Sequence, residues 1–282
     1  MVKKTGVGVL LSLVFVFIFL VPTNVFAEKG KWSFTPYAGA NVATSRDMVE
    51  GMSGAGSVAA TFSDGSQLAA AVTATVDGLS FDDTHDTPVL AGFDVGYFIS
   101  DDLEIFSGLH FVTASGNSTK VLSITAAGNF TSSGGTVTAI AVGETANVLF
   151  DDYDSWDISV GATKYFPMAD FTPYVGGYAG YKHIDEMKFK LSFATAGVHT
   201  GRIKFYDESD VGFFGFHTGI NTNWDVEGTP LTAGIRARLD YTPELDNDDS
   251  DISLVGAGGT NDAGGGVDFG LTAQLSFPFD RW

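Results

Sequence analysis

Eight segments of roughly ten residues, in which apolar side chains alternate with small or polar ones, constrain the fold of this chain more than any other feature. Successive side chains of a β-strand point to opposite faces, so a period of two predicts a strand with one apolar face. The segments lie at residues 32–42, 89–99, 103–111, 156–166, 171–182, 213–224, 231–241 and 267–279. A water-soluble sandwich built from eight such strands would have two very apolar sheets with pairs of arginines on its surface. The pattern therefore favours strands that face lipid on one side.

The connections between these segments alternate between short and long. Short turns rich in Asp, Gly and Pro lie at residues 100–102, 167–170 and 225–230, whereas residues 45–87, 114–155, 183–209 and 242–266 form long connections. Short periplasmic turns and long extracellular loops are typical of outer-membrane barrels. Only a closed barrel lets strands cross a bilayer without unpaired backbone groups. The sequence thus predicts an all-β, antiparallel, up-and-down transmembrane barrel of eight strands.

Two further pairs of alternating stretches leave the strand count open between eight and ten. They lie at residues 120–127 with 136–142, and at residues 187–193 with 202–206. They could extend the spanning strands above the membrane or add a hairpin to the barrel. Extension is favoured because Lys188, Lys190, Arg202 and Lys204 would each cost about 2–4 kcal/mol near the bilayer midplane.

The first 27 residues have the features of a secretory signal peptide. Lys3 and Lys4 precede an apolar run at residues 7–21, and residues 25–27 read Val-Phe-Ala, which predicts cleavage after Ala27. The apolar run is shorter than the roughly 20 residues of a spanning helix, the alternative interpretation, and Pro22 follows it. We therefore expect a signal peptide at residues 1–27 and one barrel domain with four long extracellular loops at residues 28–282.

Composition narrows the function classes. Fifteen Lys and Arg against 34 Asp and Glu give a formal net charge of −19, which argues against nucleic acid as a partner. The 35 Gly and 24 Phe suit strands with small lumen-facing and aromatic lipid-facing residues. The absence of Cys excludes disulfides, thiolate metal sites and a lipid anchor, and the pattern suggests no cofactor.

Four stretches make the chain resemble a known family: FTPYAGANVA after the signal, AGFDVGYFISDDLEIFSGLHF, FTPYVGGYAGYKH and the closing GLTAQLSFPF. With them the chain is similar to the OmpA-type superfamily of small outer-membrane barrels, which includes OmpX-like and opacity-protein-like members. The resemblance covers the eight strand regions and not the loops. It implies a bacterial outer-membrane location, while the family's adhesins, porin-like proteins and structural proteins leave the role open. Partners implied by this location are outer-membrane lipid, lipopolysaccharide and the barrel assembly machinery.

The polar face of the eight segments predicts a charged network inside the barrel. Its members are Asp94, Glu104, Asp157, Lys182, Arg236, Arg238, Asp240 and Asp268. Side chains nearly fill an eight-stranded barrel, and buried charges need partners. We expect Arg236 and Arg238 to bind carboxylates of other strands, Asp268 beside them and Glu104 across the lumen. A structural plug is favoured over a gated conduit for small solutes.

Acidic residues collect in the long connections, at residues 82–86, 151–154, 185–186, 207–210 and 244–251. They predict either a solvated rim or carboxylates that bind divalent cations and so bridge to lipopolysaccharide phosphates. A hydrolase would need a histidine beside an acid at this rim, for which His85 and His183 are the candidates. Loops rich in Ala, Gly, Ser and Thr favour surface display over a rigid catalytic site. The sequence therefore predicts a non-enzymatic, plugged outer-membrane barrel whose loops contact the environment or a host ligand. A narrow porin-like channel for small or apolar solutes is the alternative, and an outer-membrane hydrolase is less favoured.

Overall fold

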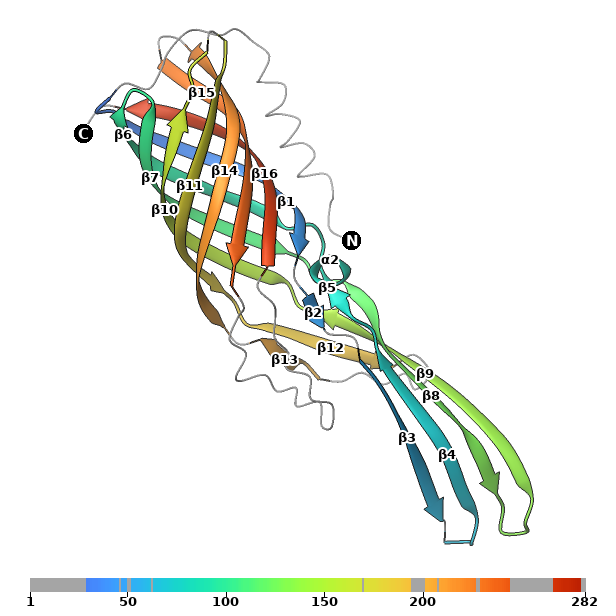
Figure 1. Ribbon diagram of the computed structural model, residues 1–282. Coiled ribbons are helices and arrows are strands. Elements are labelled where there is room, and N and C mark those ends of the chain that lie inside the picture. The colour runs from blue at the N-terminus through green and yellow to red at the C-terminus, as the bar shows by residue number, and fades with distance from the viewer. Residues whose placement is uncertain are drawn as a thin grey trace.

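The computed structural model describes residues 29–45, 47–49, 52–61, 63–168, 170–193, 201–206, 208–226, 229–243 and 266–279. These residues form β-strands and one short helix (Figure 1). Within them, no helix has the length and apolar character needed to cross a bilayer. The predicted signal peptide and its cleavage site lie outside the described residues.

Eight strands close into an antiparallel barrel, which confirms the predicted fold class. In barrel order they are β1 (Trp32–Ser45), β6 (Val89–Ser100), β7 (Leu103–Ala114), β10 (Tyr153–Tyr165), β11 (Thr172–Ile184), β14 (Ser209–Val226), β15 (Thr229–Thr242) and β16 (Gly266–Phe279). β16 pairs back onto β1, so the sheet has no free edge. The short connections lie at one end of the barrel, called the turn end, and the long ones lie at the other, called the loop end.

The register around the barrel gives the stagger of its strands. If each residue is followed to its paired residue on the next strand, the path around the barrel runs through Tyr174, Gly219, Arg236, Thr272, Gly39, Leu90, Val112 and Ser155. It returns to β11 at Ile184, ten residues beyond its start at Tyr174. This stagger over eight strands corresponds to a strand tilt of roughly 40°. A closed tube of this width has room for side chains and little else.

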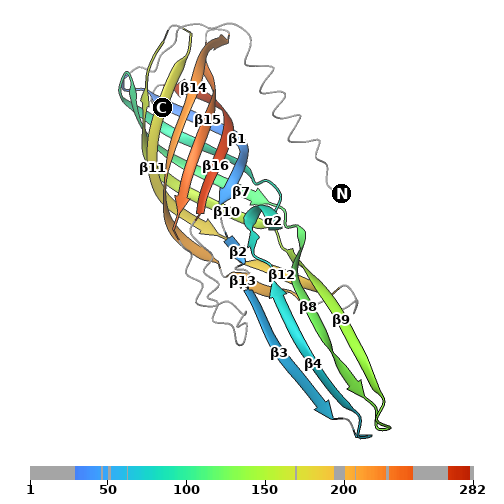
Figure 2. The same cartoon turned by 45° about the vertical axis from the view of Figure 1, so that its right-hand side comes forward.

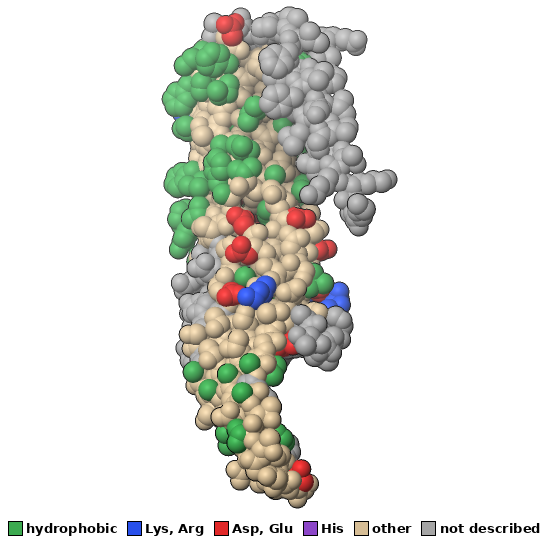
Figure 3. All heavy atoms as spheres, turned by 90° about the vertical axis from the view of Figure 1, so that its right-hand side faces the viewer, with side chains coloured by type: hydrophobic (Ala, Val, Ile, Leu, Met, Phe, Trp, Pro, Cys, Tyr) green, Lys and Arg blue, Asp and Glu red, His purple; other side chains and the backbone are tan. Residues whose placement is uncertain are grey.

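The outward side chains of the barrel form an apolar belt. Val160 is 62% exposed and Phe216 60% exposed, although both are apolar and central in their strands. Further exposed members of the belt are Phe34, Ile105, Phe111, Ile158, Val175, Phe214, Ile220, Ile235, Leu239, Leu271 and Phe277. On the face shown in Figure 3, hydrophobic side chains gather over the barrel half of the molecule, and acidic and basic residues lie next to them on the side of the loop end. The period of two in the sequence thus becomes an apolar outside and a polar inside.

The described parts of the first three long connections are largely folded into a second sheet, called the outer sheet. Its strand order is β13 (Ile203–Tyr206), β12 (Met187–Phe193), β9 (Val137–Phe150), β8 (Ser118–Thr131), β4 (Gln67–Val76) and β3 (Met52–Thr61). Figures 1 and 2 show β3, β4, β8 and β9 reaching far beyond the barrel. The stretches that left the strand count open lie in this sheet, so the alternative of ten barrel strands is wrong. They do continue the chain beyond the barrel, as the extension hypothesis expects, although they pair among themselves.

Two tight turns end the long hairpins of the outer sheet. Gly65 joins β3 to β4 with a φ of 83°, and Gly135 joins β8 to β9 with a φ of 81°. Side chains with a Cβ rarely adopt such angles, so glycine suits both turns. The Asp64 carboxylate accepts a hydrogen bond of 2.9 Å from the Ser66 backbone N–H and closes the first turn. Local turn chemistry therefore fixes where both hairpins reverse.

Candidate functional site

All eight residues predicted to form the charged network lie inside the barrel. Their side chains come from β6, β7, β10, β11, β15 and β16, and each residue is between 2% and 7% exposed. Because the strands tilt, residues at one height come from different positions in neighbouring strands. The network consequently forms tiers along the barrel axis.

Two arginines organise the middle tiers. Arg236 Nη1 lies 2.7 Å from Asp94 Oδ2 across the lumen, and its guanidinium lies 4.8 Å from the centre of the Tyr37 ring. Arg238 Nη2 lies 2.9 Å from Asp240 Oδ2, and its Nε donates to the Tyr178 hydroxyl at 3.1 Å. Each guanidinium is thus held by a carboxylate and by the face of a tyrosine, which suits a buried cation.

Further polar contacts fill the tiers towards the loop end. His110 Nδ1 lies 2.6 Å from Asp157 Oδ1. Lys182 Nζ lies 3.5 Å from Asp268 Oδ2. At the turn end, Glu104 accepts hydrogen bonds from the Ser33 and Tyr165 hydroxyls. Polar side chains therefore occupy the lumen from one end to the other.

The partners of the arginines differ from the sequence-based expectation. Asp268 was expected beside Arg236 and Arg238, and Glu104 across from them; Asp94 and Asp240 take these places. The cause is the stagger of the strands. On β16, the residue paired with Arg238 is Gly270, and Asp268 lies two residues nearer the loop end. At that height the Asp268 carboxylate meets Lys182. Glu104 lies near the start of β7, at the turn end, where it accepts hydrogen bonds from Ser33 and Tyr165 and forms no ion pair with either arginine.

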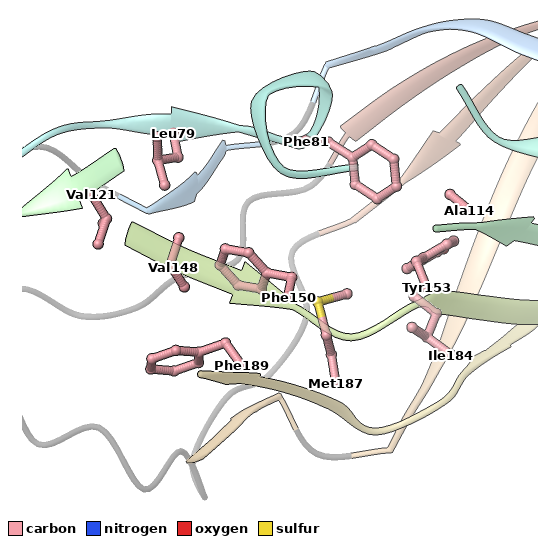
Figure 4. Close-up of a cluster of buried hydrophobic side chains, with 10 residues drawn as sticks. All are labelled: Leu79, Phe81, Ala114, Val121, Val148, Phe150, Tyr153, Ile184, Met187 and Phe189. Carbon is pink, nitrogen blue, oxygen red and sulfur yellow. The ribbon is translucent and has the colours of Figure 1, made fainter. Parts of the chain in front are cut away.

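An apolar cap covers the loop end of the lumen. Its ten buried residues are Leu79, Phe81, Ala114, Val121, Val148, Phe150, Tyr153, Ile184, Met187 and Phe189 (Figure 4). They come from both the barrel and the outer sheet, together with the short helix α2 (Phe81–Thr84) and β5 (Leu79–Ser80), which pairs with β2 (Asp47–Val49). Beneath the cap, a cavity of about 10 Å³ is lined in part by Phe81, Lys182 and Asp268. This volume is no larger than one water molecule requires.

His85, one of the two histidines considered for hydrolysis, packs against this cap. Its ring is 3% exposed and stacks on Phe81 with centroids 4.5 Å apart. Its Nδ1 lies 2.9 Å from Thr84 Oγ1, and its Nε2 lies 3.3 Å from the backbone oxygen of Asp151. Burial lowers the pKa of His85 to about 4. The imidazole is thus buried against aromatic rings, where it has no open face for a substrate.

His183 lies in a different setting at the end of β11. Its Nδ1 is 2.7 Å from Asp210 Oδ1, its Nε2 is 3.3 Å from Asp185 Oδ1, and the ring stacks on Trp156 at 5.2 Å. The structure thus brings together the histidine and acid that the sequence placed near each other. Both ring nitrogens already face carboxylates, and no group of three or more residues in the described part of the chain has the geometry of a metal site.

Sequence reasoning missed the first hairpin of the outer sheet, β3 and β4. Their sequences, MSGAGSVAAT and QLAAAVTATV, contain mostly small residues, so the alternation between their two faces is weak. The available signal was Asp64-Gly65 between two stretches without charge, a combination typical of a hairpin turn. Helix α2 was missed as well, because four residues are too few to show a helical period.

Comparisons with known proteins find likeness in solved structures alone, since neither a protein-family model nor a curated protein sequence matches the chain. Neisserial surface protein A is 12% identical at a TM-score of 0.34, and the match covers 89% of this chain and 98% of that one. The attachment invasion locus protein Ail of Yersinia pestis is 11% identical at 0.36, over 89% and 99% of the two chains. The outer membrane protease OmpT of Escherichia coli is 10% identical at 0.37, over 91% and 99%. The closed strand order of this chain itself establishes that it is a small eight-stranded barrel.

Proposed function

We propose that this chain is an integral protein of the bacterial outer membrane, with a plugged lumen and an outer sheet that makes contacts at the cell surface. Its role in this proposal is adhesion or contact with the environment, and it carries out no catalysis. The observation that supports the proposal most is the combination of a filled, capped barrel with a sheet that extends far beyond the barrel.

The apolar belt supports a place in the membrane. Monomeric soluble proteins rarely expose a continuous apolar surface of such extent, whereas a barrel strand in lipid has every second side chain apolar. Hydrocarbon also requires that all backbone groups of the spanning part are paired within the protein. The closed order of the eight strands meets that requirement.

The lumen supports a plug rather than a pore. Ion pairs join opposite walls, as between Arg236 and Asp94, and the apolar cap lies over the loop end. A solute would have to break buried ion pairs and displace the cap to pass. Breaking one buried ion pair costs about 3–5 kcal/mol, which is a large barrier for a passage with several such pairs.

Planar-bilayer recording of the purified, refolded protein tests the plug. We expect no sustained unitary openings from the natural chain. An Arg236→Ala variant opens space between β15 and β6 and serves as a positive control for detecting leakage. Sustained unitary openings of the natural protein would refute the plug and support the porin-like channel.

Whole cells test the exposure of the outer sheet. A protease recognition sequence is inserted at the turn between β3 and β4, next to Gly65, and a second variant carries it in the short turn at residues 101–102, between β6 and β7. The added protease should cut the first variant on intact cells and should cut the second after the outer membrane is opened. The reverse pattern would overturn the proposed orientation. Heat-modifiable migration on gels reports in both cases whether the barrel is folded.

A further inference from the structure

The last strand of the outer sheet, β3, is an edge strand that carries none of the usual protection against pairing. Edge strands of natural proteins are generally short, bulged, or marked by Lys or Pro. β3 has ten residues, MSGAGSVAAT, with no charge and no proline. It pairs with β4 over ten consecutive positions without a register shift. Its outer edge therefore presents a straight row of backbone donors and acceptors that pair with no strand in the described part of the chain.

The other margins of the outer sheet differ from β3. At the opposite end, β13 has four residues, one of which is Lys204, and Arg202 precedes it. β9 pairs with β12 only from Ala146 to Phe150, so its distal half is a second margin, and that half contains Glu144. Ionisable residues thus mark both of these margins. β3 is free of them, although the chain as a whole has a formal net charge of −19.

This distribution of charge favours a second copy of the same chain as the partner that pairs with the outer edge of β3. Two strongly acidic molecules repel each other wherever their charges meet, and like charges placed opposite each other on paired strands destabilise the pair. Two β3 strands can meet without any such pair. An antiparallel pair of identical strands is also compatible with a two-fold axis, so one edge serves both copies.

The direction of β3 indicates whether the second copy lies in the same membrane or in an opposing one. β3 runs away from the barrel, so two copies in one membrane would place their β3 strands parallel. A two-fold axis along the membrane normal would then place each β3 N–H group opposite the N–H group of the same residue in the other copy, so no hydrogen bond could form between them. Pairing β3 with β9 of a neighbour would continue the sheet, but the twist of four strands rotates successive copies by about 80–100°. Neither arrangement suits barrels that share a flat membrane.

We propose that β3 pairs antiparallel with β3 of a second copy in an opposing membrane, which makes the outer sheet a homotypic tether between two membranes. This inference rests on the proposed function, because it needs the outer sheet outside the cell. Each contact is small, and many copies on two facing membranes act together. From the lengths of β3 and β9, the barrel mouths of a pair would lie roughly 55 Å apart.

Vesicle tethering tests the proposal independently of orientation in the cell. The full mature chain is reconstituted by detergent removal into two vesicle populations with different dyes, and protease cutting at the β3–β4 turn measures the number of outward-facing sheets. Vesicles that both carry the protein should form two-colour pairs at least tenfold more often than protein vesicles mixed with empty ones. Equal pairing with empty vesicles would mean binding to lipid and would overturn the proposal.

Charge-swap variants test the edge itself. Ala55 and Ala59 are exposed on one face of β3, and a β3 pair centred on Ser57 brings Ala55 of one copy opposite Ala59 of the other. The Ala55→Lys/Ala59→Lys protein and the Ala55→Asp/Ala59→Asp protein should each lose tethering when used alone. Mixing the two populations should restore it, and this recovery excludes misfolding as the cause of the loss.

A matched control uses two residues of β8, the second strand from β3 in the outer sheet, that are aligned across the sheet with Ala55 and Ala59. Thr125 and Asn129 of β8 are exposed and are aligned with Ala55 and Ala59 through Thr73 and Ala69 of β4. Thr125→Lys/Asn129→Lys should tether like the natural chain. An equal loss in this control, or undiminished tethering by the lysine variant of β3, would refute pairing at the edge. Failure of tethering while the turn remains cut on intact cells would refute this inference and leave the proposed function standing.

Discussion

A lysine at the centre of the apolar belt provides a direct test of whether this surface faces lipid. Val160 is 62% exposed in the middle of β10, and its paired neighbours are Ser107 and Ala179. Val142 of the outer sheet is 59% exposed. The substitutions Val160→Lys and Val142→Lys therefore place the same charge on β-strands at nearly equal exposure. If both sites were in water, the two costs would be alike.

The expected costs differ because the surroundings differ. From Val160, a lysine ammonium would have to pass several residues of strand to reach either edge of a belt about 25 Å tall, farther than the stem of the side chain extends. Ala179 has no polar group, and the single hydroxyl of Ser107 cannot replace the hydration shell of an ammonium. The full midplane cost of about 2–4 kcal/mol is thus expected for Val160→Lys. For Val142→Lys, as for other surface substitutions, we expect about 0.5 kcal/mol or less.

Equilibrium unfolding by urea in lipid vesicles, followed by tryptophan fluorescence, measures both values. A cost of about 2–4 kcal/mol corresponds to a factor of roughly 30 to 1,000 in the unfolding equilibrium constant. Val160→Leu is the control for a change of shape without charge. Equal destabilisation by the two lysine substitutions would refute a lipid-facing belt.

Three further predictions concern the lumen and the cap. Arg236→Met should destabilise the barrel by about 3–5 kcal/mol in urea unfolding because it leaves Asp94 buried without its cation, and the additional substitution Asp94→Leu should recover most of the loss. Met187→Ala, at a residue 2% exposed, should weaken the cap by about 2–5 kcal/mol, seen as faster hydrogen exchange near Phe81 with the barrel unchanged. With an ordinary pKa of 6.5 lowered to about 4 in the cap, His85 binds a proton more readily in the opened state. Cap protection should therefore fall by up to about 3 kcal/mol as the pH drops from 6.5 to 4, and a His85→Gln variant that retains the pH dependence would contradict this.

The alternation of side chains was sufficient to predict the barrel. A period of two is a local property of the backbone, so it places Asp94, Arg236 and Arg238 on the inner face whatever the neighbouring strands do. The short and long connections likewise predicted the up-and-down order of the eight strands. Both inferences depend on residues that are close together in the sequence.

The pairs inside the lumen could not be predicted in the same way. Which carboxylate meets Arg236 depends on the stagger of ten residues around the closed sheet, and that stagger is a property of the whole ring. Sequence reasoning placed Asp268 beside the arginines, whereas the ring places it beside Lys182. The same stagger places Glu104 at the turn end, beside Ser33 and Tyr165.

The sequence by itself thus indicated a barrel of alternating strands, their two faces and the charged residues of the lumen, because every second side chain meets a different solvent. It left the number of strands open between eight and ten, and the structure decided for eight. The tertiary structure alone decided the ion pairs, the burial of His85 beneath the cap and the order of strands in the outer sheet. β3 and β4 consist mostly of small residues, so the contrast between their two faces is weak. A weak contrast gives a weak periodic signal, and long-range pairing with β8 assigns the hairpin its place.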